Sequence, residues 1–156
     1  MADDPFTAVL KALWDILEAN SEFSSLVSLG NRRKLWTGDT KIDKDSYSPA
    51  DLPEVTIVPA GGTSNPVATS TGGNVIQIYR IQMLDGNLQA SSSYFPLKWA
   101  IFKALASIDG LLSLSYVRGI SVGDSVEERS FEDHPGWKLG IEIEVQMWWA
   151  RTYLKA

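Results

Sequence analysis

The stretch WKLGIEIEVQMWW, residues 137–149, decides the fold class of this chain. Every odd-numbered position from Trp137 to Trp149 is apolar, whereas lysine, glycine, glutamate and glutamine fill the even-numbered positions before Trp148. Alternation with a period of two is typical of a strand that packs one face on a core and turns the other to water. We therefore expect a long β-strand here, paired with the strand that precedes it.

Two amphipathic helices are expected to cover the apolar face of this strand. The first spans about residues 5–19, where Asp3 or Asp4 caps the helix and Pro5 suits its first position. The second spans about residues 95–108, with a proline near its start and a glycine just past its end. Their apolar stripes follow 3.6-residue spacing: Phe6, Val9, Leu10, Leu13, Trp14, Ile16 and Leu17, then Leu97, Ile101, Ala104, Leu105 and Ile108.

Further strands are predicted over residues 54–58, 75–84 and 116–128, with a brief one over 34–37. Between two of them, residues 59–74 read PAGGTSNPVATSTGGN, a composition that buries too little apolar area to order itself. We interpret this segment as a long, mobile hairpin loop, because long loops in compact domains are typically functional or disordered.

The predicted order of elements is α–(β)–β–β–α–β–β. No repeat or internal linker divides the 156 residues, a length that suits one domain. The pattern predicts an α+β fold: a two-layer sandwich with two helices on one face of a mainly antiparallel sheet of four to five strands.

The charge balance argues against nucleic-acid binding as the main role. The chain has 19 acidic and 14 basic residues, whereas binding to phosphates normally needs a basic excess. The basic cluster Arg32-Arg33-Lys34 is interpreted as a solvated turn. No cysteine is present, which excludes disulfides and thiolate metal sites. The start MADDPF has no basic signal region and no apolar run is long enough for a membrane span, so we expect synthesis in the cytoplasm and no membrane partner.

The sequence offers no catalytic, cofactor-binding or metal-binding motif. His134 lies beside two acids, but it supplies one ligand where zinc needs three or four, and we interpret it as a turn residue. Glu142 and Glu144 share a strand face, and we interpret them as solvent-facing acids rather than a catalytic pair. The glycine pairs lack the lysine of a phosphate-binding loop.

Aromatic residues are the candidates for partner contacts. Trp99 and Phe102 lie off the main stripe of the second helix, so this helix is expected to be covered on two sides. Trp148 falls on the polar side of the last strand, where it is either covered by a terminal segment or an interface anchor. Trp36 is also hard to place in the core. With the loop residues Thr63, Ser64, Asn65 and Pro66, these form the predicted partner interface.

The chain resembles the tail terminator and neck (head–tail joining) proteins of tailed bacteriophages. The likeness lies in the order of the N-terminal helix, the LPEVTIVPAGG strand entering the loop, and the next strand. It continues with the YFPLKWAIFKALASIDGL helix and the closing hairpin that ends in GWKLGIEIEVQMWW. It covers most of the chain, but it is a likeness of pattern without a diagnostic short motif.

The resemblance implies a homo-oligomeric ring, expected to be a hexamer, in the tail or neck of a virion. Such a ring would stop growth of the tail tube and bind tube or sheath proteins on one side and neck or connector proteins on the other. DNA would pass through its centre, where Glu142 and Glu144 could line the channel. A second interpretation stays open: a monomeric small-molecule-binding or catalytic domain with the 59–74 loop as a lid.

Overall fold

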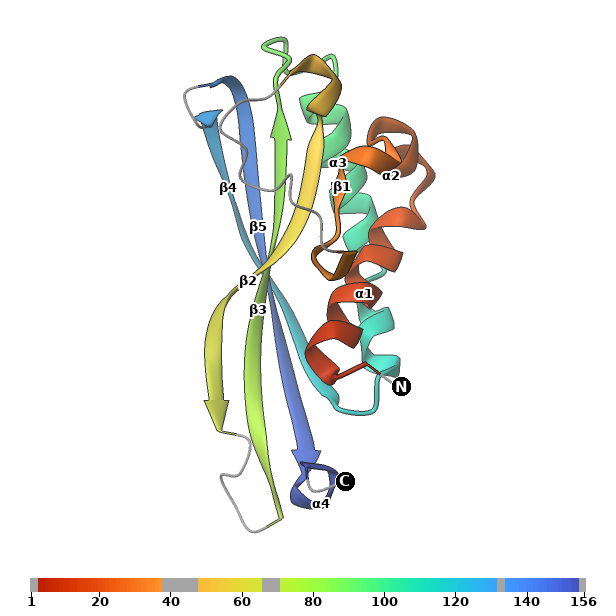
Figure 1. The fold of residues 1–156 in the computed structure, drawn as a ribbon, viewed down its shortest axis with the longest axis vertical. Helices are drawn as coiled ribbons and strands as arrows, with labels where there is room; N and C mark the ends of the chain where they lie inside the picture. Colours follow the sequence, from red (N-terminus) through yellow and green to blue (C-terminus); the bar gives the residue numbers. More distant parts are fainter. Residues whose placement is uncertain (1–2, 38–47, 66–70, 132–133, 155–156) are drawn as a thin grey trace.

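The computed structural model describes residues 3–37, 48–65, 71–131 and 134–154, and it forms a sheet with helices on one face (Figure 1). The order of the strands across the sheet is β1-β2-β3-β5-β4. β1 pairs with β2 in parallel, and the other adjacent pairs are antiparallel. The strands are β1 (Arg32–Arg33), β2 (Glu54–Asn65), β3 (Gly72–Asp85), β4 (Val117–Phe131) and β5 (His134–Ala150).

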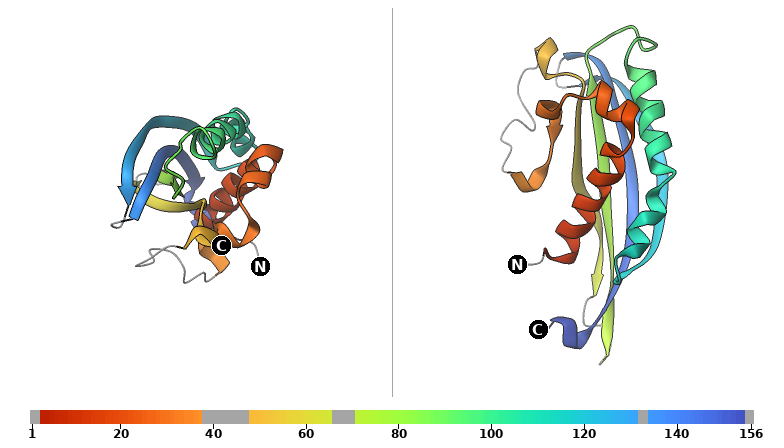
Figure 2. Two further views of the ribbon diagram at one scale, coloured as in Figure 1. Left: turned by 90° about the horizontal axis from the view of Figure 1, so that it is seen from above. Right: turned by 90° about the vertical axis from the view of Figure 1, so that its right-hand side faces the viewer.

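The helical layer consists mainly of α1 (Pro5–Glu18) and α3 (Tyr94–Leu105). Both lie on the same face of the sheet, to the right of the strands in Figure 1 and in front of them in the right-hand view of Figure 2, and the other face is called the open face. Asp4 caps α1, as predicted: its carboxylate accepts a 2.9 Å hydrogen bond from the Thr7 backbone N–H. The shorter helices are α2 (Ser21–Leu26), α4 (Arg151–Leu154), which lies at the end of β5, and the 3₁₀ turns η1 (Leu29–Asn31), η2 (Leu35–Thr37), η3 (Pro49–Asp51) and η4 (Ile108–Ser113).

The core fills the space between the helices and the sheet. β5 alternates as predicted, because its odd-numbered residues from Leu139 to Trp149 are buried and Gln146 is exposed. The fold class is confirmed: an α+β sandwich with a five-stranded, mostly antiparallel sheet. The largest fully buried apolar side chains come from both layers: Trp14, Phe23, Leu13 and Leu17 from the α1–α2 region, Tyr94, Leu97 and Ile101 from α3, Leu111 from η4, and Ile57, Ile81 and Met83 from the sheet.

The predicted loop over residues 59–74 was too long. β2 continues to Asn65 and β3 begins at Gly72, while residues 66–70 lie outside the described part of the chain. Pairing of polar residues needs only backbone hydrogen bonds, so the composition of this segment does not prevent it from forming strand. A register shift between Pro59 and Gly62 absorbs the glycines, and Gly62 adopts a φ of +135°.

The paired segments Pro59–Asn65 of β2 and Gly72–Gln77 of β3 are called the arm. The arm extends past the end of the helical layer, at the lower end of Figure 1. Its sequence is free of charged residues in both segments. Residues 61–65 in the β2 half of the arm are exposed, whereas Val75 in its β3 half belongs to the core.

Two other predicted boundaries also moved. The brief strand expected over residues 34–37 is a 3₁₀ turn, and the strand lies just before it at Arg32–Arg33. The second helix ends at Leu105 rather than near residue 108, and a 3₁₀ turn continues from Ile108. In both places, a 3₁₀ turn lies where the sequence predicted part of a strand or of an α-helix.

Candidate assembly surface

The outer side of α3 carries an exposed aromatic stripe. Phe95, Trp99 and Phe102 follow i, i+4, i+7 spacing, which places them on one side of the helix. Trp99 is 60% exposed and Phe102 is 37% exposed. The Lys103 ammonium lies 5.9 Å from the Trp99 ring and that of Lys98 lies 5.6 Å from the Phe102 ring. The separate aromatic face predicted for this helix is present, and it is exposed within the described chain.

A groove runs between this stripe and the edge strand β4. One wall comes from Phe102 and Leu105 of α3 and from Ala106 just after the helix, and the other comes from Val122 and residues 123–125 of β4. Ile141 of β5 also lines the groove. The volume of the groove is about 460 Å³. Because β4 pairs with β5 on one side and is the last strand of the sheet, its backbone edge borders this groove.

Polar contacts fix the separation of α3 and β4 beside the groove. The Tyr94 hydroxyl donates a 2.9 Å hydrogen bond to the Glu127 carboxylate, and the Lys98 ammonium forms an ion pair with the same group. The hydrogen bond from Lys98, assisted by that from Tyr94, lowers the pKa of Glu127 although partial burial opposes the shift. Glu127 therefore stays ionised and ties the helix to the strand.

Trp36 lies on the opposite flank of the sheet, in the turn that follows β1. Its ring is 37% exposed and lies between two ammonium groups, with Lys11 at 5.7 Å and Lys34 at 5.8 Å from its centroid. Lys11 is itself held by Asp3 at 3.0 Å. These contacts hold an indole at the surface in a defined position.

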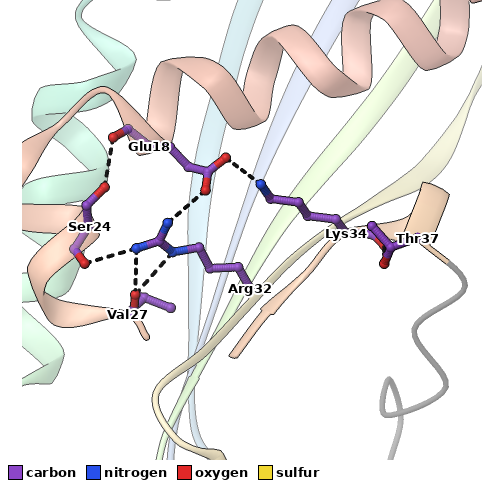
Figure 3. Close-up of polar contacts among 6 residues, drawn as sticks. All are labelled: Glu18, Ser24, Val27, Arg32, Lys34 and Thr37. Carbon is purple, nitrogen blue, oxygen red and sulfur yellow. Dashed lines mark hydrogen bonds and ion pairs between the residues drawn. The ribbon is translucent and has the colours of Figure 1, made fainter. Parts of the chain in front are cut away.

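The basic cluster Arg32-Arg33-Lys34 is a structural element, which corrects its interpretation as a solvated turn. Figure 3 shows that Arg32 binds Glu18 and closes the end of α2. Its guanidinium donates to Glu18 Oε2 at 2.7 Å and to the backbone carbonyls of Ser24 and Val27 at 2.9 Å. Lys34 Nζ binds the other oxygen of Glu18 at 2.6 Å. Arg32 and Lys34 are therefore engaged in hydrogen bonds and ion pairs within the fold.

The electrostatics of Glu18 follow from this network. Burial alone would raise the pKa of its carboxyl, but the hydrogen bonds from Lys34 and Arg32 outweigh burial, and the pKa is lowered. Arg33 points the other way and forms a buried ion pair with Glu54, with Nε–Oε2 at 3.1 Å and side chains 2% and 3% exposed. A sequence reading missed this pair because the parallel pairing of β1 with β2 has no local signal.

The predicted interface residues of the hairpin are strand residues of the arm. Thr63, Ser64 and Asn65 are exposed and pair with Ile76, Val75 and Asn74 of β3. Pro66 lies outside the described residues. The role of these residues in partner binding stays a prediction. It now concerns the exposed residues of a strand rather than those of a loop.

Trp148 is half-buried on the open face of the sheet, beside the far end of the arm, where it pairs with Asn74. The Arg118 guanidinium lies 5.7 Å from its ring centroid. A Cβ atom on Gly72 would lie 2.7 Å from the ring, so the arm packs closely against this indole. The cover comes from β3 and β4, and a partner contact for Trp148 stays a prediction.

The open face also carries the two acids that were predicted to line a channel. Arg80 Nη2 lies 2.7 Å from Glu142 Oε1, and Glu144 follows two residues along the same face. The concave part of this face holds about 540 Å³, with Lys138 and Glu128 also on its wall. The face is therefore of mixed charge rather than uniformly acidic.

The described residues offer no metal-binding cluster. Among them, no group of three or more His, Asp or Glu side chains is placed to hold a metal ion. The backbone of His134 opens β5, and its side chain is outside the described part. No helix in the described residues is long and apolar enough to cross a bilayer. The candidate partner-binding features of the described residues are therefore the exposed aromatic stripe, the groove and Trp36.

Comparison with known proteins gives a match of fold. No family model matches the sequence, and no curated protein matches it either. Among solved structures, the chain is similar to one from the virion of a native gene transfer agent (GTA) particle. The TM-score is 0.55 at 11% sequence identity, and the match covers 90% of this chain and 94% of the other.

Proposed function

We propose that this chain is a structural protein of a phage-like virion that assembles with copies of itself into a ring. The likeness to a chain of a gene transfer agent virion carries this proposal, because it extends over 90% of this chain and 94% of the other. The match therefore concerns the complete fold rather than a shared substructure.

The exposed surfaces support self-assembly as the working principle. In a monomer, the aromatic stripe of α3 and the apolar groove beside it are exposed to water, which is unfavourable. Exposed apolar patches of this kind mark sites of protein contact. Trp36 lies on the other flank of the same sheet. Two different patches on opposite flanks suit head-to-tail association, which closes into rings when the rotation between copies allows it.

The finer form of the proposal places the ring, a hexamer, at the head-proximal end of a phage tail. There it would end the tail tube and connect it to the neck, in contact with tube or sheath and connector proteins. The order of elements in the sequence supports this position. DNA would pass through without specific binding. This suits an overall charge of −5 and the ion pairs that Arg32 and Lys34 form with Glu18.

Electron microscopy of the purified protein at increasing concentration tests the proposal. We expect closed rings of one diameter that persist in moderate salt. Scattered particles of subunit size at every concentration would contradict it. Filaments in place of rings would support self-assembly but would contradict a closed ring.

The second candidate is a monomeric small-molecule-binding or catalytic domain. The concave open face, with Arg80, Lys138, Glu128 and Glu142 on its wall, favours this function as a site of mixed charge. The arm is paired strand up to Asn65, so the lid expected over residues 59–74 is shorter than this function assumed. A monomer that binds a small anion or zwitterion at this face would support the second candidate against the first.

A further inference from the structure

The groove between α3 and β4 and the exposed Trp36 have matching chemistry. The groove offers apolar walls from Phe102, Leu105 and Val122, and Asp124 lines both this groove and the concave part of the open face. Trp36 offers an indole held between the Lys11 and Lys34 ammonium groups. An aromatic side chain flanked by cations thus faces outward on one flank, and an apolar groove with an acid lies on the other.

The two features lie at the same height along the strands. Following the pairing across the sheet, Ile57 is joined through Ile81 and Ile141 to Ser125, a residue of the groove. At the other end of this row, β1 runs parallel to β2 with Arg33 opposite Thr56. The turn that carries Trp36 follows β1 directly and contacts β2. Trp36 and the groove therefore lie near opposite ends of the same rows of residues.

The direction of the strands permits copies to join along these rows. β2, β3, β5 and β4 alternate in direction, because each neighbouring pair is antiparallel. When two copies lie side by side with the same orientation, β4 of one copy faces β1 of the next copy, and beyond β1 the edge of β2, in the antiparallel sense. Such a join uses two different surfaces and repeats from copy to copy.

We propose that Trp36 of one copy inserts into the groove formed by Phe102, Leu105, Val122 and Ser125 of the next copy. The ammonium groups of Lys11 and Lys34, which stay paired with Asp3 and Glu18, then approach Asp124 at the side of the groove, and this attraction helps to set the register of the join. A buried tryptophan surrounded by apolar walls is the usual anchor of a protein interface. The inference rests on the proposed ring and names the contact that builds it.

Cysteine cross-linking tests the contact directly, because the parent chain contains no cysteine. Thr37 and Ser125 are exposed and become the pair Thr37→Cys and Ser125→Cys in one chain. Since they lie at opposite edges of the sheet, a disulfide between them joins two copies. We expect mild oxidation to give a ladder of covalent multimers that ends at the size of the ring.

The matched controls are the two single-cysteine variants and the pair Thr37→Cys with Ser91→Cys, an exposed residue of the loop before α3. They should not build a ladder. A second readout uses Trp36→Ala, which should weaken assembly at least about tenfold by light scattering on dilution. Leu88→Ala, which also removes an exposed apolar side chain, should leave assembly unchanged.

The outcomes separate this inference from the proposed function. If the parent assembles but the groove pair gives no ladder, or the control pair gives an equal one, the contact is wrong and the ring stands. Unchanged assembly of Trp36→Ala also overturns the contact. If the parent is monomeric at every concentration, both the ring and the contact fail.

Discussion

Arg80 and Glu142 face each other across β3 and β5 on the open side of the sheet, with Nη2–Oε1 at 2.7 Å. Both side chains are partly exposed, at 40% and 46%. An exposed pair of this kind contributes about 0–1 kcal/mol to stability. The pair therefore does more to set the charge of this face than to hold the fold.

The charge of the open face can be inverted to ask whether it faces a channel. Replacing Glu142 and Glu144 with lysine should leave the subunit folded, because both side chains lie on the solvent side of β5. If this face lines the ring, the variant should bind DNA in a salt-sensitive manner where the parent does not. Filter binding at two salt concentrations measures this.

The control variant for that experiment makes the same change of net charge on the helical layer instead of on the open face. Asp15 and Asp109 are exposed on the helical side, and replacing both with lysine alters the net charge equally. Equal DNA binding by the two variants would show a general charge effect. A folded Glu142/Glu144 variant that ignores DNA would show that another surface lines the channel.

The buried pair of Arg33 and Glu54 should dominate the stability of the β1 edge. Glu54→Gln leaves the Arg33 guanidinium buried beside a neutral amide, and we expect a loss of roughly 3–5 kcal/mol. Urea unfolding measures this, with Glu142→Gln as the exposed control that should lose less than about 1 kcal/mol. Similar losses of unfolding free energy in both variants would mean that burial does not determine how much an ion pair contributes to stability.

The start of the arm depends on a glycine. Gly62 has a φ of +135°, and a Cβ atom there would lie 2.0 Å from the Ile76 carbonyl oxygen. Gly62→Ala should therefore destabilise the protein by more than about 1 kcal/mol. Gly110→Ala is the control, because a Cβ there meets nothing within 4 Å. Thermal unfolding compares the two, and an unaffected Gly62 variant would contradict the bulge.

Acid should weaken the contact between α1 and the β1 segment through Glu18. Its pKa is lowered below the ordinary value of 4.5, so the folded state favours the ionised carboxylate. This contribution is complete above that ordinary value and is lost as the pH falls through the lower pKa of the folded state. Glu18→Gln should be less stable at neutral pH and lose less stability on acidification. Parallel pH curves of the urea midpoint for parent and variant would refute this.

The sequence predicted what local periodicity controls. The alternation in residues 137–149 predicted the two faces of β5, because it is repeated along one strand. The apolar stripe of the first helix predicted most of its buried side, but Phe6 of that stripe is 38% exposed. The sequence pattern failed for Pro59–Asn65, whose strand state comes from pairing with β3 rather than from its own side chains. It also missed the burial of Arg33, which depends on Glu54, a partner 21 residues away.

The candidate site was predicted only as separate residues. Trp36, Trp99 and Phe102 were selected as aromatics without a place in the core, and the structure exposes all three. Their arrangement on opposite flanks follows from the strand order β1-β2-β3-β5-β4, which is a long-range property. The groove beside Phe102 required the position of β4 relative to α3, which the sequence does not contain.

Self-assembly is the central claim, and native mass spectrometry tests it most directly. The subunit mass is 17.2 kDa, so the account predicts one dominant species at an integer multiple of that mass, expected to be six. This species should persist on dilution and disappear in the Trp36→Ala variant. A dominant peak at the subunit mass across the whole concentration range would contradict the account.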